Sequence, residues 1–442
     1  MSRRVVIIGA GGRDFHNFNI FFRDNPDYHV VAFVHVSQIP GLKSRRYPPE
    51  LAGSLYPEGI PIYTEKDLEK IIRENKVDEA VISYSDLSYK ELGNIISRVI
   101  ASGASVRILG PDETFIRSIR PVIAVTAVKT GSGKSSLSRK ISEHLKRRGV
   151  RFVVVRHPMV YKDPGRMIVQ YFERPEDLDK EDLTIEEREE YEHYVLRGVK
   201  VLAGVDYGKI LRKAEEIADV IIWDGGNNDW PFYRPDLMFT VVDAMRPEYI
   251  DESFPGEVNV RMSDVLVINK IDQVSREDLE KIEKKLRKMN PKAEIIKAVS
   301  EVSVDRPDLI SGRRVLVIED SPTVTHGGAR YGAGYVAARK YGAREIIDPR
   351  GCAVGILREL YKEYPHMAEI LPSTGYTEEQ LKDLKETIER CSPDALVIAT
   401  PSSIEKILDI KIPSARVSFD LKVVEGRKIE DVIDDFLEKI SR

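Results

Sequence analysis

The sequence predicts three consecutive α/β domains of the three-layer, doubly wound kind, at residues 1–119, 120–301 and 302–442. A chain of 442 residues is too long for one hydrophobic core, because domains usually hold about 100–200 residues. Hydrophobic residues make up 42% of it, enough to fill several cores. Short β-branched segments typical of buried parallel strands alternate with helical segments. This alternation is typical of doubly wound sheets.

Charge and composition exclude several classes of protein. The net charge of −4 gives no broad attraction to nucleic acids or membranes, so neither is expected as a partner. The N-terminal apolar run is too short for a signal peptide, and no segment reaches the ~18 apolar residues of a membrane span. We therefore expect a soluble, cytoplasmic protein. Its many charges of both signs and its few cysteines fit a thermophile.

The chain has two cysteines, Cys352 and Cys391, which lie far apart in the sequence. Two cysteines cannot form a disulfide framework, and their spacing is not that of metal ligands. We expect two buried, inert thiols.

The first domain is predicted to be Rossmann-like, with strands at residues 5–8, 30–34, 80–83 and 106–109 and helices at 65–74 and 89–102. Gly9, Gly11 and Gly12 after the first strand form a partial dinucleotide fingerprint. Asp14 replaces the third glycine, and His35 stands where an acidic residue would bind a ribose, which argues against NAD. The loop amides either bind an anionic substrate, aided by Arg13, His16 and Asn17, or serve a purely architectural domain.

The other two domains repeat the alternation. Strands are predicted at residues 122–126, 152–155, 220–223, 238–242 and 265–268, with a helix at 136–148, and then at 315–318 and 395–399, with a helix at 333–341. Residues 176–197 are acidic and helical in character, and we expect them to form a solvated insertion. A glycine-rich segment at 327–334 precedes a helix. Its glycines indicate either a second anion site or close packing of the helix on the sheet.

A phosphate-binding loop follows the strand at residues 122–126. The backbone amides of such a loop and of the next helix converge on phosphate oxygens. We expect Lys134 to neutralise the β- and γ-phosphates and the hydroxyl of Ser135 to ligate Mg²⁺. The predicted nucleotide-binding residues of the loop are Lys129, Thr130, Gly131, Ser132, Gly133, Lys134, Ser135 and Ser136.

This loop departs from the usual Walker A pattern, because Val128 occupies the position of the first glycine. With Lys129 next to it, the loop resembles the deviant Walker A of the signature-lysine P-loop class, which includes dethiobiotin synthetases and the nitrogenase iron protein. The resemblance implies that Lys129 is a second cation for the nucleotide phosphates. In that class it often acts across a dimer interface, so a homodimer or higher homo-oligomer is implied.

Asp224 follows the buried segment at 220–223, which makes it the Walker B candidate. An aspartate at the carboxyl end of a buried strand lies where open α/β sheets bind ligands, and it can hold Mg²⁺ together with Ser135. The residues after it, Asn227, Asn228 and Asp229, offer donors and acceptors to a substrate. The alternative is a polar turn that does nothing but follow the strand.

Asn269, Lys270 and Asp272 follow the segment at 265–268. They resemble the Asn-Lys-x-Asp motif of GTPases, in which the aspartate accepts two hydrogen bonds from guanine. We expect a contact with the nucleotide base. The choice between ATP and GTP stays open, because relatives of the class use the same position with ATP.

Several further segments suggest a family. These are Arg156-His157-Pro158, Trp223-Asp-Gly-Gly-Asn-Asn-Asp229, Arg246-Pro247 and the run from Glu319 to Gly334. Over nearly the whole chain they resemble archaeal cyclic 2,3-diphosphoglycerate synthetases and related predicted GTPases. The resemblance implies ATP-dependent phosphoanhydride formation within 2,3-diphosphoglycerate, which gives the cyclic product, ADP and phosphate. The implied catalytic residues are Lys129, Lys134 and Asp224.

Such an anionic substrate requires cations around it. The candidates are Arg156, His157, Arg166, Arg246, His326, Arg330 and Arg350, although each arginine could be an ordinary surface or ion-paired residue and each histidine a buried core residue. The alternative function is a GTPase of the signature-lysine class that acts as a switch or metallochaperone-like protein. An NAD-binding oxidoreductase is disfavoured by the incomplete fingerprint.

Overall fold

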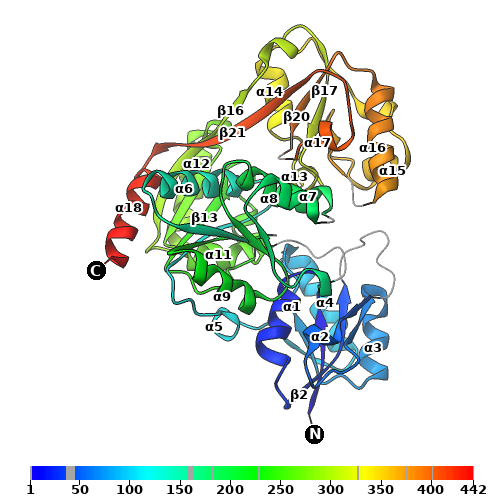
Figure 1. Cartoon of the computed structure of the whole chain (residues 1–442). Helices are drawn as coiled ribbons and strands as arrows, with labels where there is room; N and C mark the ends of the chain where they lie inside the picture. The colour runs from blue at the N-terminus through cyan, green and yellow to red at the C-terminus, as the bar shows by residue number, and fades with distance from the viewer. Residues whose placement is uncertain are drawn as a thin grey trace.

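The computed structural model describes residues 2–35, 45–157, 164–181, 183–226, 229–325, 328–374, 377–400 and 402–441. The chain is mixed α/β, with a six-stranded sheet at its N-terminus and one continuous 13-stranded sheet through the rest. Figure 1 shows three successive parts, blue, green and orange, from the N-terminus upward. No helix of the described residues is both long and apolar enough to cross a lipid bilayer.

The N-terminal sheet has the strand order β3-β4-β2-β1-β5-β7, and all its neighbours are parallel except β3 and β4. Buried side chains lie on both of its faces, as in a doubly wound sheet. Its strands are β1 Arg3–Ile8, β2 Tyr28–His35, β3 Arg45–Tyr47, β4 Ile60–Thr64, β5 Glu79–Ile82 and β7 Ser105–Arg107. Its helices are α1 Arg13–Asn17, α2 Pro49–Ala52, α3 Leu68–Glu74, α4 Tyr89–Ala101 and α5 Pro111–Thr114.

The central part contributes the strand order β10-β11-β9-β12-β8-β13-β15-β16 to the large sheet, parallel from β11 to β16. Its strands are β8 Val122–Ala127, β9 Phe152–Arg156, β10 Gln170–Phe172, β11 Val201–Ala203, β12 Val220–Asp224, β13 Leu237–Asp243, β15 Val265–Asn269 and β16 Glu294–Val304. Its helices are α6 Lys134–Arg147, α7 Pro175–Lys180, α8 Ile185–Val195, α9 Tyr207–Ile217, α10 Tyr249–Glu252, α11 Gly256–Met262 and α12 Arg276–Met289. Helices α6 and α8 pack on one face and α9 on the other.

The C-terminal part continues the same sheet through the long antiparallel pair β16 and β21 (Figure 1). Its strands are β17 Arg314–Glu319, β18 Glu345–Ile346, β19 Leu371–Pro372, β20 Ala395–Ala399 and β21 Ser414–Glu425. Its helices are α13 Ser321–Val324, α14 Ala333–Lys340, α15 Gly355–Glu363, α16 Glu378–Cys391, α17 Ile404–Ile407 and α18 Ile429–Ile440. Helix α18 returns to pack on α6 of the central part.

The N-terminal part is joined to the centre by a third sheet of two strands. Strand β6 (Leu87–Ser88) pairs antiparallel with β14 (Ser253–Phe254). A buried ion pair between Arg13 and Asp229 crosses the same interface. The carboxyl ends of β1 and of the central strands therefore face each other.

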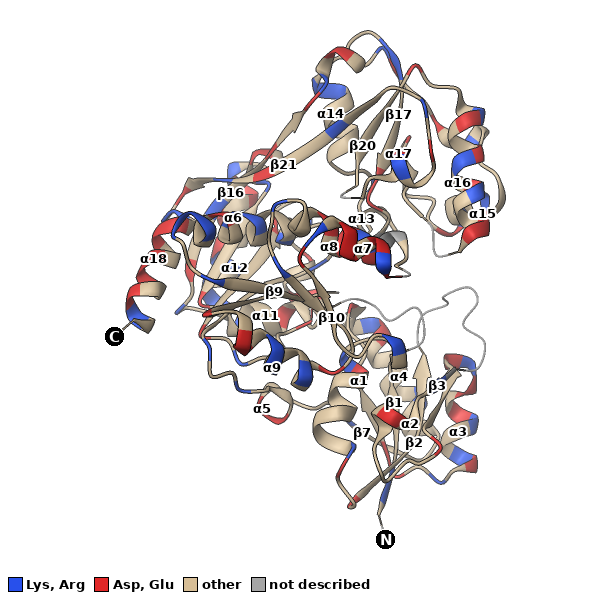
Figure 2. Cartoon of the chain, in the orientation of Figure 1, with Lys and Arg blue, Asp and Glu red and all other residues tan. Residues whose placement is uncertain are grey.

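The expected solvated insertion at residues 176–197 is wrong. In helix α8, Tyr191 and Tyr194 are fully buried in the core, and Glu189 is only 5% exposed. The helix is acidic because its carboxylates meet polar groups of the C-terminal part, and Figure 2 shows these acidic helices beside that part. Charge count alone does not separate a solvated helix from one whose charges are paired inside the molecule.

The expectation of two inert thiols is also wrong. Cys352 and Cys391 form a disulfide between the loop before α15 and the end of α16, with a Cα–Cα distance of 5.4 Å. The described residues between them fold back along one face of the C-terminal sheet and bring the two ends together.

Candidate active site

A cavity of about 290 Å³ lies between the phosphate-binding loop and the C-terminal part. Its walls come from the loop, from α8, from the end of β17 and from the segment that leads into α14. It thus opens at the carboxyl ends of parallel strands in two parts of one sheet, where doubly wound folds bind ligands.

The loop between β8 and α6 has the shape that cradles phosphates. Gly133 has φ +110°, and a Cβ there would lie 2.3 Å from Nδ2 of Asn269, so only glycine fits. Lys129, Thr130, Lys134 and Ser135 line the cavity together with Gly131 and Gly133. Helix α6 begins at Lys134 directly after the loop, and a helix N-terminus in this position offers free backbone amides to an anion.

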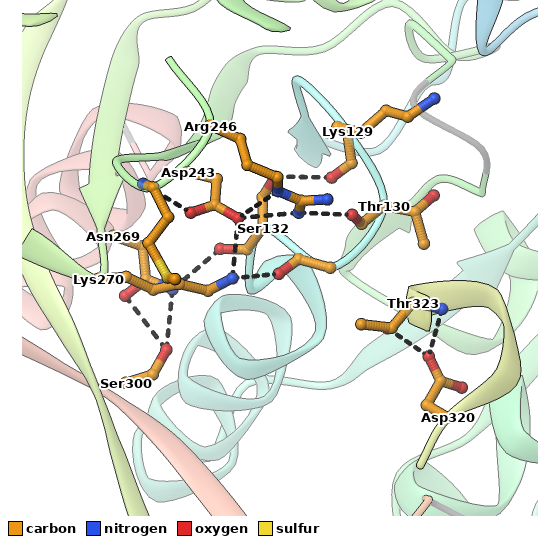
Figure 3. A network of polar contacts seen from close by, with 12 residues as sticks. Lys129, Thr130, Ser132, Asp243, Arg246, Asn269, Lys270, Ser300, Asp320 and Thr323 are labelled. Carbon is orange, nitrogen blue, oxygen red and sulfur yellow. Dashed lines mark hydrogen bonds and ion pairs between the residues drawn. The ribbon is translucent and has the colours of Figure 1, made fainter. Parts of the chain in front are cut away.

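Three side chains hold this loop from beneath by binding its carbonyls (Figure 3). Asn269 Nδ2 donates to Ser132 O at 2.9 Å, Lys270 Nζ to Gly131 O at 2.8 Å and Arg246 Nη2 to Thr130 O at 2.9 Å. The expectation that Arg246 grips the substrate therefore needs correction, because its guanidinium is engaged by the loop and by Asp243.

Asp243, which the sequence analysis did not single out, joins two of these cations. Its Oδ2 lies 2.8 Å from Lys270 Nζ and 2.8 Å from Arg246 Nη2. Burial raises the pKa of this carboxyl, but the two cations outweigh burial and bring its pKa below the ordinary value. It stays ionised and fixes the loop.

Asp224 ends β12 and is completely buried. Its Oδ1 accepts from Lys134 Nζ at 2.6 Å, and its Oδ2 accepts from the Tyr194 hydroxyl at 2.7 Å and pairs with Arg156. Burial raises the pKa of Asp224, but Arg156 and Lys134 lower it further, to well below its ordinary value. Burial also lowers the pKa of Lys134, with help from Arg156, to about 8.

These groups suit Mg²⁺, which prefers oxygen ligands and usually keeps one or two carboxylates beside the phosphates. Asp224 is ionised, and the Ser135 hydroxyl lines the same cavity. Mg²⁺ bound there would neutralise charge on the nucleotide phosphates. With nucleotide bound, Lys134 has the phosphates as an alternative partner to Asp224.

Lys129 is held within its own chain. Its ammonium pairs with Asp86 of the N-terminal part, and it lies over the ring of Tyr249 at 5.4 Å from the centroid. The side chains of Lys129 and Asp86 are only 11% and 13% exposed. The action across a dimer interface, and with it the expected homo-oligomer, stays a prediction.

Asp229 and His157 meet at the interface with the N-terminal part. His157 Nδ1 lies 3.1 Å from Asp229 Oδ2, and Arg13 Nε lies 3.0 Å from Asp229 Oδ1. His157 also lines the cavity, whereas Asp229 does not. Asp229, which we expected to meet the substrate, holds the N-terminal part instead, because Arg13 neutralises it in a buried pair.

In the two glycine-rich segments outside the P-loop, several described amides are engaged by carboxylates of the chain itself. The amides of Gly11 and Gly12 donate to Asp14 Oδ1 at 2.8 and 2.9 Å. In the segment before α14, the amides of Gly332 and Tyr335 donate to Glu319 Oε1 at 3.0 and 2.8 Å. Each loop already binds a carboxylate of its own chain, which favours the architectural and packing interpretations.

The remaining residues that we predicted for the site lie at separate places in the structure. Asp272 is exposed at the rim of the cavity and accepts from Gln273 Nε2 at 2.6 Å. Ser136 Oγ donates to Phe419 O of β21 at 3.2 Å rather than facing the cavity, and Arg330 is exposed between two cavity residues. Asn227, Asn228 and His326 lie outside the described residues.

One wall of the cavity is acidic, which we did not predict from the sequence. Glu187, Glu189 and Glu190 of α8 line it, as do Glu319 and Asp320 after β17. Burial raises the pKa of Glu319 to about 7, although the amides of Tyr335, Gly334 and Gly332 oppose the shift. The rule that selected Asp224, an acid at the end of a buried strand, would have selected Glu319 too.

The sequence is similar to those of several known proteins. Residues 211–297 match the model of the CobW/HypB/UreG nucleotide-binding domain. Over 441 residues, which is all of this chain and 98% of the relative, the sequence is 52% identical to the arginine synthetase ArcE of Thermococcus kodakarensis. The chain belongs to the ArcE family.

The chain is also similar to more distant relatives. The cyclic 2,3-diphosphoglycerate synthetase of Thermococcus gammatolerans is 24% identical over 62% of the chain and 68% of that relative, and that of Thermococcus sibiricus is 34% identical over 21% and 23%. Among solved structures, LpxK of Aquifex aeolicus in complex with ATP covers 78% of this chain and 95% of its own, with 15% identity and a TM-score of 0.42. The protein is thus a P-loop enzyme among synthetases, and the resemblance to the cyclic 2,3-diphosphoglycerate enzymes holds at the level of this wider group.

Proposed function

We propose that this protein is an ATP-dependent arginine synthetase. The observation that carries the proposal is the 52% identity to an arginine synthetase over the entire chain. The cavity supports it, because both cations, among them Lys134 of the P-loop, and carboxylates, among them Glu319 after β17, line it. A triphosphate and a cationic product each find a complementary wall there.

The chemistry follows from what arginine contains. Its guanidinium differs from a ureido group by one nitrogen in place of oxygen, so the oxygen must leave. In our proposal the ureido oxygen attacks the γ-phosphorus, ADP leaves, ammonia adds to the activated carbon, and the oxygen departs with phosphate. Lys129, Lys134 and Arg156 would stabilise the charge on the transferring phosphoryl group.

The test is ADP release in the presence of Mg²⁺, with ATP and GTP assayed in parallel. We expect turnover with ATP only when citrulline, the ureido counterpart of arginine, and ammonium are both present. Arginine should accumulate in step with ADP. Turnover that depends on neither citrulline nor ammonium would refute the proposal.

Cyclic 2,3-diphosphoglycerate synthesis is the second candidate, favoured by the partial similarity to the two cyclic 2,3-diphosphoglycerate synthetases. The carboxylates of the cavity oppose it, because they would repel a substrate with two phosphates and a carboxylate. The same assay with 2,3-diphosphoglycerate, followed by phosphorus NMR, distinguishes the two syntheses.

A GTP-driven switch, favoured by the CobW/HypB/UreG match, would instead hydrolyse GTP without any small acceptor.

A further inference from the structure

The C-terminal strands form a wall of the cavity that contains the P-loop. Glu319 ends β17 in register with Pro372 of β19 and Ala399 of β20. The residues that follow those two, Ser373 and Thr400, are buried and polar. Parallel strands that diverge on two sides of a central strand open a crevice at their carboxyl ends.

A carboxylate from the central part reaches into this crevice. Glu189 of α8 accepts from Ser373 Oγ at 2.9 Å, from Ser402 Oγ at 3.3 Å and from the Thr400 hydroxyl. Glu189 and Glu319 are 5% and 2% exposed, and both line the cavity that contains the P-loop. Two buried carboxylates from different parts of the chain therefore converge on the ends of the same strands.

Nothing in the described chain supplies a cation to Glu319: its hydrogen-bond donors are backbone amides, and no described lysine or arginine pairs with it. A second, independent feature points to a ligand. His193 of α8 lines the cavity, is 7% exposed, and its Nδ1 has no hydrogen-bond partner among the described residues. Buried polar atoms are nearly always paired in native proteins, so this nitrogen needs a partner.

The residues around this crevice limit the class of ligand that it can bind. Among the described residues, no group of three or more metal-ligating side chains is arranged to hold a metal ion. An anion would meet the carboxylates of Glu189, Glu319 and Asp320 on one wall. A planar cation with several N–H donors fits best, because it can bind carboxylates in two directions at once.

We propose that the crevice bounded by Glu189 and Glu319 binds the guanidinium end of arginine. The inference rests on the proposed function, since arginine is taken as the product. It assigns the two ends of the cavity to the two reactants: the nucleotide lies on the P-loop, and the amino-acid side chain points from the C-terminal strands toward it.

The test is calorimetric titration of the full chain, loaded with Mg²⁺ and ADP, with arginine and with citrulline. In Glu319→Gln and Glu189→Gln the Kd for arginine should rise about tenfold or more, because a charge-assisted hydrogen bond is lost. The Kd for uncharged citrulline should change much less, and the Kd for ADP should stay the same. Glu386→Gln, on the exposed side of α16 and half exposed, is the matched control.

Glu319→Gln retains an oxygen that can accept from Gly332 and Tyr335, so it should fold even where Glu189→Gln does not. In the wild type, arginine should slow amide hydrogen exchange at residues 331–335 and 395–400. Unchanged arginine affinity in Glu319→Gln, or protection only in the N-terminal part, would overturn the site but leave the proposed function standing. A wild type that neither binds nor makes arginine would overturn both.

Discussion

At the phosphate end of the cavity, individual side chains have separate roles. Lys134 is the cation on which turnover depends, because it is the loop's own lysine and its Nζ lies 2.6 Å from Asp224 Oδ1. Lys134→Ala should lower turnover by about 100-fold or more. The fold should persist, since Arg156 and Tyr194 still bind Asp224.

The control is Arg147→Ala on the same helix α6, where the side chain is 65% exposed. It should leave turnover unchanged. Initial rates of ADP release measure both variants. Wild-type turnover in Lys134→Ala would contradict the assignment of the phosphate-binding loop.

The raised pKa of Glu319 makes the stability of the protein depend on pH. Its pKa is about 7 in the folded protein against an ordinary value of 4.5, so the protonated acid favours folding. The stability it contributes is complete below about pH 4.5 and is lost as pH rises through about 7. Relative to the wild type, Glu319→Gln should therefore gain stability between pH 5 and 8, by about 3 kcal/mol at most. Urea unfolding of both proteins at matched pH measures this gain in stability. A difference in unfolding free energy that does not change with pH would refute the raised pKa of Glu319.

Among the elements, α8 shows most clearly what the sequence could predict and what it could not. The P-loop, its flanking strand and helix, and Asp224 were predictable because local spacing determines them. The placement of α8 was not, because its acidic residues look solvated until the hydroxyls of Ser373 and Ser402, about 180 to 210 residues later, are brought against Glu189. Arg246 and Asp229 were misassigned for the same reason: their partners, Asp243 and Arg13, became visible only in the fold.

The disulfide between Cys352 and Cys391 should contribute to the stability of the C-terminal helices that it links. It closes a loop of 39 residues that contains α15 and most of α16. Cys391→Ser, or reduction of the wild type, should cost about 4 kcal/mol of unfolding free energy from the loop-closure entropy. Thermal unfolding with and without reductant measures it. An equal melting temperature in both conditions would show that the bond does not form in solution.

For the whole molecule, the N-terminal part is coupled to the nucleotide site through buried charges. Arg13 pairs with Asp229 just after the Walker B strand, and Asp86 pairs with Lys129 of the P-loop. Removing one partner of a buried pair leaves the other unneutralised. Arg13→Ala should therefore destabilise the protein by about 3–5 kcal/mol.

Arg3→Ala is the matched control, since Arg3 is 56% exposed in a weak pair with Glu79. It should cost less than about 1 kcal/mol. Urea denaturation followed by circular dichroism measures both. Equal effects of the two substitutions would show that the interface with the N-terminal part contributes little.

In our proposal, the cavity between the P-loop and the C-terminal part brings ATP and an arginine precursor together. The most direct measurement supplies ATP, Mg²⁺, citrulline and ¹⁵N-labelled ammonium to the wild-type chain and follows the label by mass spectrometry. We expect one ¹⁵N in the guanidinium group of arginine for each ADP formed, and no label without ATP. ADP formation without labelled arginine, or a cyclic pyrophosphate formed from 2,3-diphosphoglycerate in its place, would show that the protein is not an arginine synthetase.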